Sequence, residues 1–212
     1  MKLTIQHETV YRYDAPVRSS TQYIRLTPRE NSRQKILEWN VDTSVPATRT
    51  NDGYGNVMHV LTIDKPVSEV RIRAHGVVQA RSDAGTGGED SSDEVPYPAN
   101  STLSPLVYIR PTQITRVDAA LQAFAEGHRR RGNTLTGLRT LANAISDKMP
   151  LKPEDSGVAT SAAEAFAGRS VSVRDQAHVF IACCRQLGIP ARFVSGYLYS
   201  AKGLTEDHIS GH

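Results

Sequence analysis

The chain has 212 residues, a hydrophobic content of 39% and a formal net charge of +3, and this length suits one or two domains with buried cores. No apolar run approaches the roughly 18 residues of a membrane-spanning helix, and the N-terminus lacks the apolar region of a secretory signal, so we expect a cytoplasmic protein without a membrane partner. The only cysteines, Cys183 and Cys184, are adjacent, which excludes a disulfide framework, and the mild charge does not indicate nucleic-acid binding.

The first 81 residues have the pattern of β structure. Apolar and polar residues alternate from Leu3 to Tyr11 and again from Val70 to Ala74, which is the period of half-buried strands. Between these stretches, residues 51–56 read NDGYGN, a dense turn signal that joins two strands. We therefore expect residues 1–81 to form a β-sandwich-like domain.

A polar segment follows the β region. Residues 82–94, SDAGTGGEDSSDE, contain no apolar residue beyond Ala84, so the segment cannot bury enough surface to offset the entropy lost on ordering. We expect a flexible acidic linker over residues 82–98 and a second domain over residues 99–212.

The second domain begins with three expected helices. Thr115 would cap the first of them, because its hydroxyl can bond the backbone N–H groups that a helix start leaves free. Residues 135–149 carry apolar side chains at helical spacing. Ser161, with Glu164 three positions later, has the pattern of a capping box and predicts the start of the third helix.

The run over residues 172–199 reads SVRDQAHVFIACCRQLGIPARFVSGYLY and predicts one helix followed by one strand. Ser172 stands where an N-cap belongs. Gly188 and Pro190 are typical of residues that lie just beyond a helix end. After them the chain becomes β-branched and aromatic, which favours a strand over residues 191–199.

This run resembles the core of the transglutaminase-like superfamily, whose papain-like fold places a nucleophilic cysteine at the start of the helix. Members read Gly-Val-Cys-Gln-Asp-(aromatic or His)-Ala-His there and Leu-Gly-Ile-Pro-Ala-Arg-(aromatic)-Val-Ser-Gly-Tyr at its end. The first 80 residues resemble the β-domain that precedes this core in bacterial members. The matching features are HETVYRYDAPV at 7–17, LTPR at 26–29, Trp39 and the DGYGN turn at 52–56.

The resemblance implies an α+β protein: an N-terminal β-sandwich-like domain, then a papain-like core of helices against a short antiparallel sheet. It also implies acyl transfer by a Cys-His-Asp triad, with no obligatory cofactor and with a peptide or protein as substrate. In this mechanism a thiolate attacks a glutamine carboxamide or a peptide carbonyl and forms a thioester.

The triad itself is incomplete in this sequence. Asp175, Ala177 and His178 keep register with the family motif, but the position of the nucleophilic cysteine is Val173, and a valine cannot attack a carbonyl. The chain ends at His212, which aligns with the general base, before the strand that would carry the Asp. We therefore expect an incomplete, truncated core.

Three functions follow from this pattern. The first is a catalytically inactive homologue that binds a peptide-like or protein partner. The second is an active acyl-transfer enzyme that another chain completes. The third is a non-enzymatic interaction module in which the β-domain carries the function.

Other side chains in the run have structural interpretations. Ser172 is one residue from the nucleophile position, a rotation of about 100° on a helix, so we expect it to cap the helix rather than to attack a substrate. Cys184 lies on the apolar face of the helix and is expected to be a buried structural thiol. His178 is expected to pack, and Asp175 to make structural hydrogen bonds.

The end of the chain carries two further expectations. His208 and His212 could form a metal pair only on a helix, and no third ligand accompanies them, so we expect no metal site. Val194, Tyr197 and Tyr199 would lie on a sheet edge that nothing covers, which favours pairing with another chain. A homodimer through that edge is the expected consequence.

Overall fold

The computed structural model describes residues 1–31, 34–80, 103–129, 135–151, 161–168 and 171–197. The chain divides into two compact units, Met1–Glu89 and Asp90–His212. The linker expected over 82–98, and with it both expected domain boundaries, lies outside the described residues. Strands occur in the first unit and helices in the second, which confirms the predicted α+β class.

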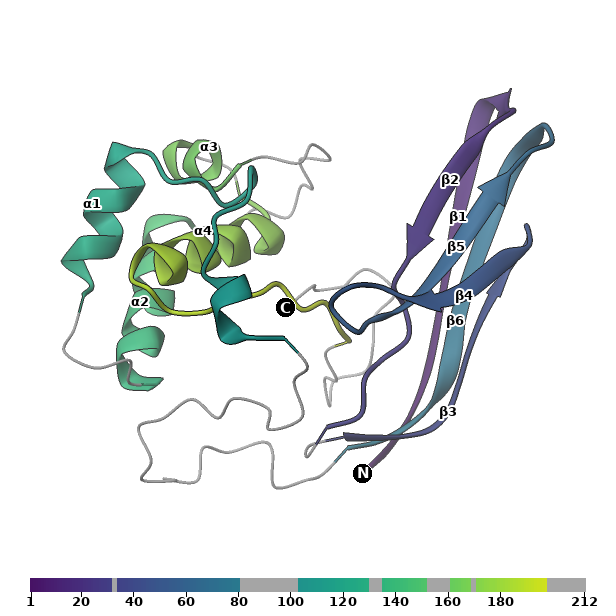
Figure 1. Cartoon of the computed structure of the whole chain (residues 1–212), viewed down its shortest axis with the longest axis horizontal. Helices are drawn as coiled ribbons and strands as arrows, with labels where there is room; N and C mark the ends of the chain where they lie inside the picture. The colour runs from purple at the N-terminus through teal and green to yellow at the C-terminus, as the bar shows by residue number, and fades with distance from the viewer. Residues whose placement is uncertain (32–33, 81–102, 130–134, 152–160, 169–170, 198–212) are drawn as a thin grey trace. The chain divides into compact units, whose positions relative to one another are not determined.

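The first unit contains two three-stranded antiparallel sheets (Figure 1). The first sheet has the order β1-β6-β3 and the second β2-β5-β4. The strands are β1 (Lys2–Val17), β2 (Ser20–Ile24), β3 (Gln34–Thr43), β4 (Ala47–Asn51), β5 (Val57–Ile63) and β6 (Val67–Ala80).

The core of the first unit comes from the alternation that the sequence shows. In β6, Val70 and Ile72 are buried, while Arg71 between them is exposed, because successive side chains of a strand point to opposite faces. They share a core cluster with residues of the second sheet, Ile24, Leu61 and Ile63. The alternation predicted for this stretch is confirmed.

A close approach of two strands explains Gly76 in the middle of β6. Gly76 pairs with Trp39 of β3, beside a register shift between Ile36 and Glu38. A Cβ atom at position 76 would lie 2.9 Å from the Cα atom of Trp39 and would also meet the backbone carbonyl of Glu38. Only glycine fits here without moving the strand.

The turn predicted at residues 51–56 joins β4 to β5, and Asp52 organises it. Its Oδ1 accepts hydrogen bonds from the backbone N–H groups of Tyr54 and Asn56, both at 2.9 Å. Its Oδ2 accepts from Arg25 Nε at 2.7 Å and Asn56 Nδ2 at 3.0 Å. Burial opposes the negative charge, but these bonds outweigh it and hold the pKa of Asp52 far below its ordinary range.

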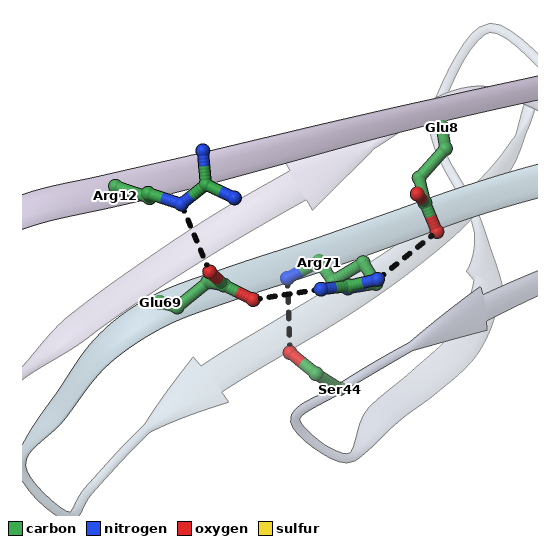
Figure 2. Close-up of polar contacts among 5 residues, drawn as sticks. All are labelled: Glu8, Arg12, Ser44, Glu69 and Arg71. Atoms are coloured by element: carbon green, nitrogen blue, oxygen red, sulfur yellow. Dashed lines mark hydrogen bonds and ion pairs between the residues drawn. The ribbon is translucent and has the colours of Figure 1, made fainter.

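The outer face of the first sheet carries a row of linked charges. Figure 2 shows Glu69 between Arg12 of β1 and Arg71 of its own strand, with Arg71 also reaching Glu8. The backbone N–H of Arg71 donates to Ser44 Oγ at 2.9 Å. These side chains are exposed, so the row marks the solvated face of the sheet.

The second unit is helical in its described residues (Figure 1). Its elements are the 3-10 turn η2 (Pro105–Tyr108) and the helices α1 (Ala119–Gly127), α2 (Leu135–Lys148), α3 (Ala162–Ala167) and α4 (Val173–Gln186). Helix α4 packs against each of the other three. Apolar residues of all four helices form one cluster around it, among them Leu121, Leu141, Ala165 and Val179. No helix in the described ranges is long and apolar enough to cross a bilayer.

The prediction that Thr115 caps the first helix is wrong. Asp118 is the N-cap of α1, and its side chain accepts a hydrogen bond from the backbone N–H of Leu121 at 2.8 Å. Thr115 is buried, and its hydroxyl bonds Thr112 and the guanidinium of Arg185. A tertiary contact therefore uses the hydroxyl that a local pattern assigned to a cap.

The strand predicted over 191–199 is also not found in its described part, residues 191–197. A strand needs a hydrogen-bonded neighbour, and none pairs with this segment among the described residues. Instead the N–H of Ala191 donates to the carbonyl of Tyr108 at 3.2 Å. The short sheet expected against the helices is therefore not formed in the described part of the second unit.

Two consequences follow for the end of the chain. Val194 and Tyr197 are exposed, but they do not lie on a strand edge, and Tyr199 lies outside the described residues. The homodimer therefore stays a prediction, and the edge strand through which it was expected to form is not found in the described residues.

Candidate active site at the start of helix α4

The first turn of α4 is closed by a reciprocal pair of side chains. Ser172 is the N-cap, in an extended conformation, and its Oγ accepts a hydrogen bond from the backbone N–H of Asp175 at 3.2 Å. In return, Asp175 Oδ2 accepts from the backbone N–H of Ser172 at 2.9 Å and from its hydroxyl at 2.8 Å. This is a capping box, and it confirms the prediction that Ser172 caps the helix.

Val173 is the first residue of α4, and it is half-buried. Free backbone N–H groups and the positive end of the helix dipole meet at such a position. A thiol there would be deprotonated more easily than a free cysteine. The isopropyl group of Val173 has neither a lone pair nor a proton to lose, so it makes no use of this environment.

Further along the same helix, His178 packs against the segment that follows α4. Its ring stacks on that of Phe193, with centroids 5.3 Å apart. Burial lowers the pKa of His178, Arg174 and Arg185 lower it further, and Asp175 acts in the opposite direction. The contact with Phe193 supports the packing role that was expected for His178.

The two cysteines cannot replace the missing nucleophile. Cys183 and Cys184 are both buried in the helical core. Burial raises the pKa of each thiol to about 12, so neither forms a thiolate at neutral pH. Cys184 is thus the buried structural thiol that its position on the apolar face predicted.

Arg185, in the last turn of α4, is a structural residue that sequence reasoning missed. Its Nε and Nη2 both donate to the carbonyl oxygen of Ala191, at 3.2 and 2.9 Å, and its Nη1 donates to Thr115 Oγ1 at 2.9 Å. The turn between α4 and Ala191 includes Gly188, whose φ of 79° is the left-handed conformation expected after a helix end. Arg185 closes this turn, and an arginine just before the Gly-Ile-Pro motif was the available signal.

The structure brings only part of the expected site together. Ser172, Val173 and Asp175 share one helical turn. His212, the expected general base, and His208 lie outside the described residues. Within the described ranges, no group of three His, Cys, Asp or Glu side chains could hold a metal ion.

Comparison with known families matches both units. Residues 3–79 match the bacterial transglutaminase-like N-terminal region, and residues 122–210 match the transglutaminase-like superfamily. The second match contains the whole of α4 and the segment after it.

Relatives extend over nearly the whole chain. An uncharacterized protein of Mycobacterium leprae is 31% identical over 206 residues, which are 93% of this chain and 71% of that protein. An uncharacterized protein of Mycobacterium tuberculosis is 26% identical over 218 residues, which are 98% of this chain and 69% of that protein.

A solved structure has the same fold. The crystal structure of a Cytophaga hutchinsonii protein named "putative cysteine protease" superposes with a TM-score of 0.70 and 17% sequence identity. The match covers 94% of this chain and 68% of that protein. It supports the predicted architecture of a β-domain followed by a transglutaminase-like core.

Proposed function

Because the chain belongs to the transglutaminase-like superfamily, we propose that it is a non-catalytic member that binds a peptide or protein partner without transferring an acyl group. The observation that carries this proposal is Val173 at the first position of α4. In the mechanism that the family resemblance implies, a sulfur atom at this position forms the bond to the substrate carbonyl carbon.

No neighbouring side chain supplies a substitute nucleophile. The hydroxyl of Ser172 bonds the carboxylate of Asp175 and accepts from its backbone N–H, so it serves the helix cap. Cys183 lies ten residues beyond Val173, a rise of about 15 Å along the helix. Its thiol is buried, and its pKa of about 12 keeps it protonated.

Retention of the scaffold supports a binding role. The capping box at Ser172 keeps the helix start at which the family holds its nucleophile, and the closed turn after α4 brings Phe193 back against His178 of the same helix. Next to α4, the segment 193–197 exposes apolar side chains of Phe193, Val194 and Tyr197. Exposed apolar side chains that lie together on a surface are typical of sites at which protein partners bind.

Activity assays of the purified chain test the absence of catalysis. We expect neither hydrolysis of a glutamine-containing peptide nor incorporation of an amine into it. Thiol-dependent turnover would overturn the proposal, and turnover that appears only after a second polypeptide is added would favour an enzyme completed by a partner chain.

A cysteine variant tests whether the scaffold still activates a thiol. We expect Val173→Cys to react with iodoacetamide at a lower pH than Val194→Cys, the matched control on an exposed segment away from a helix start. The wild-type chain should give little background, because Cys183 and Cys184 are buried. Equal pH profiles for the two variants would show that the site no longer favours a thiolate.

Backbone NMR tests the binding role directly. Titration with a glutamine-containing peptide should shift resonances of residues 173–178 and 193–197. Shifts confined to strands of the first unit would instead favour the β-domain interaction module, and no shift at any peptide concentration would contradict peptide binding.

A further inference from the structure

Two buried polar atoms on one face of α4 have no hydrogen-bond partner among the described residues. Asp175 is 2% exposed, and while its Oδ2 closes the capping box, its Oδ1 is unbonded. The Nδ1 atom of His178 is buried and unbonded as well. Residues three apart on a helix are neighbours on its surface, so both atoms belong to the same patch of α4.

A buried polar atom without a partner is costly, and it indicates a group that completes its hydrogen bonds. The two atoms differ in what they can accept or give. A carboxylate only accepts, whereas Nδ1 of a neutral imidazole is a donor in one tautomer and an acceptor in the other. Because the charge of Asp175 acts on the ring of His178, an N–H group turned toward the carboxylate is favoured over a lone pair.

The charged groups around His178 favour a neutral ring. Arg174 and Arg185 on the same helix lower its pKa in addition to burial, and Asp175 is the one group that raises it. From the other side the ring meets Phe193, which carries no charge. The tautomer of the neutral ring is therefore the property that Asp175 can set.

We propose that Asp175 and His178 share one buried water molecule and that the carboxylate thereby holds the imidazole as the Nδ1–H tautomer. His178 Nδ1–H donates to the water oxygen, and the water donates one hydrogen to Asp175 Oδ1. A water that donated to both atoms would leave a lone pair of Nδ1 turned toward the negative carboxylate, so the charge favours the Nδ1–H form, and buried waters commonly bridge such groups.

This site makes Asp175 a positioning residue with two functions. Through Oδ2 it caps the helix at the nucleophile position, and through Oδ1 it orients the ring that supports Phe193. The start of α4 and the segment after it are thus linked by one carboxylate. The inference does not depend on catalysis or on peptide binding, so it can fail while the proposed function stands, and the reverse also holds.

The experiment is long-range 15N NMR of the imidazole of His178, recorded at a pH where the ring is neutral. We expect the Nδ1–H tautomer in the wild-type chain. In Asp175→Asn the amide oxygen can retain the cap, while the Nδ2–H group replaces the free oxygen as a donor. Without the negative charge the preference for Nδ1–H is lost, and the water can donate to Nδ1, so we expect the tautomer to change to Nε2–H.

Glu164→Gln is the matched control. Glu164 closes a second capping box with Ser161 at the start of α3, so the same change from carboxylate to amide is made at a helix start without a buried histidine beside it. The tautomer of His178 should not change in this variant. An Nε2–H tautomer in the wild-type chain would overturn the proposal even if Asp175→Asn failed to fold, and so would an unchanged tautomer in a folded Asp175→Asn.

Discussion

Asp52 in the β-sandwich unit and Asp175 in the helical unit each accept hydrogen bonds from nearby backbone N–H groups through a carboxylate. The two carboxylates differ in how many of their oxygens have hydrogen-bond partners. Asp52 has two hydrogen bonds on each oxygen, all within its own turn and from the neighbouring Arg25. Asp175 has both of its bonds on one oxygen. A fully bonded carboxylate is part of a finished structural turn, whereas a half-bonded one indicates that another group belongs beside it.

The same contrast extends to the two units as wholes. In the first, alternation and turn chemistry account for the strands and the packed core. In the second, the helices pack around α4, but the first residue of that helix, where the family has its nucleophilic cysteine, is a valine.

The two units can be followed by different signals. Since Trp39 is the only tryptophan, its fluorescence reports unfolding of the first unit, and circular dichroism at 222 nm reports the helices of the second.

The largest loss of stability is expected for Gly76→Ala, which disturbs the packing of β3 against β6 in the first unit. The added methyl group would meet the backbone of β3, and overpacking of this kind lowers the free energy of unfolding by about 3 kcal/mol. Trp39 fluorescence during urea unfolding measures it. Gly53→Ala is the control, because a Cβ there meets nothing within 4 Å, and equal losses in both variants would contradict the close approach of β3 and β6.

The second largest effect is expected for Asp52→Ala, because this change removes all the hydrogen bonds that the carboxylate accepts. Hydrogen bonds to a charged group contribute most among such contacts, and we expect a loss of about 2 kcal/mol at pH 7. The folded pKa of Asp52 is lowered from 3.8, so its contribution is complete above that pH and is lost as the pH falls below it. Urea unfolding at pH 7 and pH 3 should show the variant and wild type converging, and a constant difference would contradict the role of the charge.

Ser172→Ala tests the capping box that Ser172 forms with Asp175 in the second unit. Loss of an N-cap hydroxyl costs about 1 kcal/mol, and the loss should appear in the helical signal at 222 nm with the Trp39 transition unchanged. Ser172→Asp should recover little, because it would place a second carboxylate beside Asp175. A shift in the fluorescence transition of similar size would show that the two units do not unfold independently.

The smallest effect concerns His59 of β5, whose pKa, like that of His178 in the second unit, is lowered by burial and by arginine. Burial lowers the pKa of His59 from 6.5, and Arg49 on the neighbouring strand lowers it further. A depressed histidine pKa stabilises the folded state fully above 6.5, and this stability is lost as the pH falls toward the folded pKa. His59→Gln should therefore flatten the pH dependence of the Trp39 transition between pH 6.5 and pH 5, and an unaltered slope would exclude His59 as its source.

Local patterns predicted those features whose partners lie close in the sequence. The alternation in β6, the capping box at Ser161 and the N-cap at Ser172 depend on residues within a few positions of each other. The left-handed Gly188 is likewise set by the helix end that it follows. For such features the sequence contains both the side chain and its partner.

Features that depend on distant residues were not predictable in this way. Thr115 is a residue type that often caps helices, but its hydroxyl accepts a hydrogen bond from Arg185, 70 residues later. The segment after α4 has strand-forming residues, but a strand depends on a neighbour, and none is found among the described residues. Val173 was identified at the sequence level because a family motif fixed its place, and the state of Asp175 Oδ1 became visible only from the packing.

The charged row on the first sheet protects that sheet against misalignment. Arg12 stands directly opposite Glu69, and Val10 opposite Arg71. If β1 slid by two residues in one direction, Arg12 would face Arg71, and two like charges opposed across strands repel. A slide in the other direction would set Val10 against Glu69 and break the Arg12–Glu69 pair. The apolar face would tolerate either slide, since a two-residue shift keeps it inward, so the solvent-facing charges favour the native alignment over both slides.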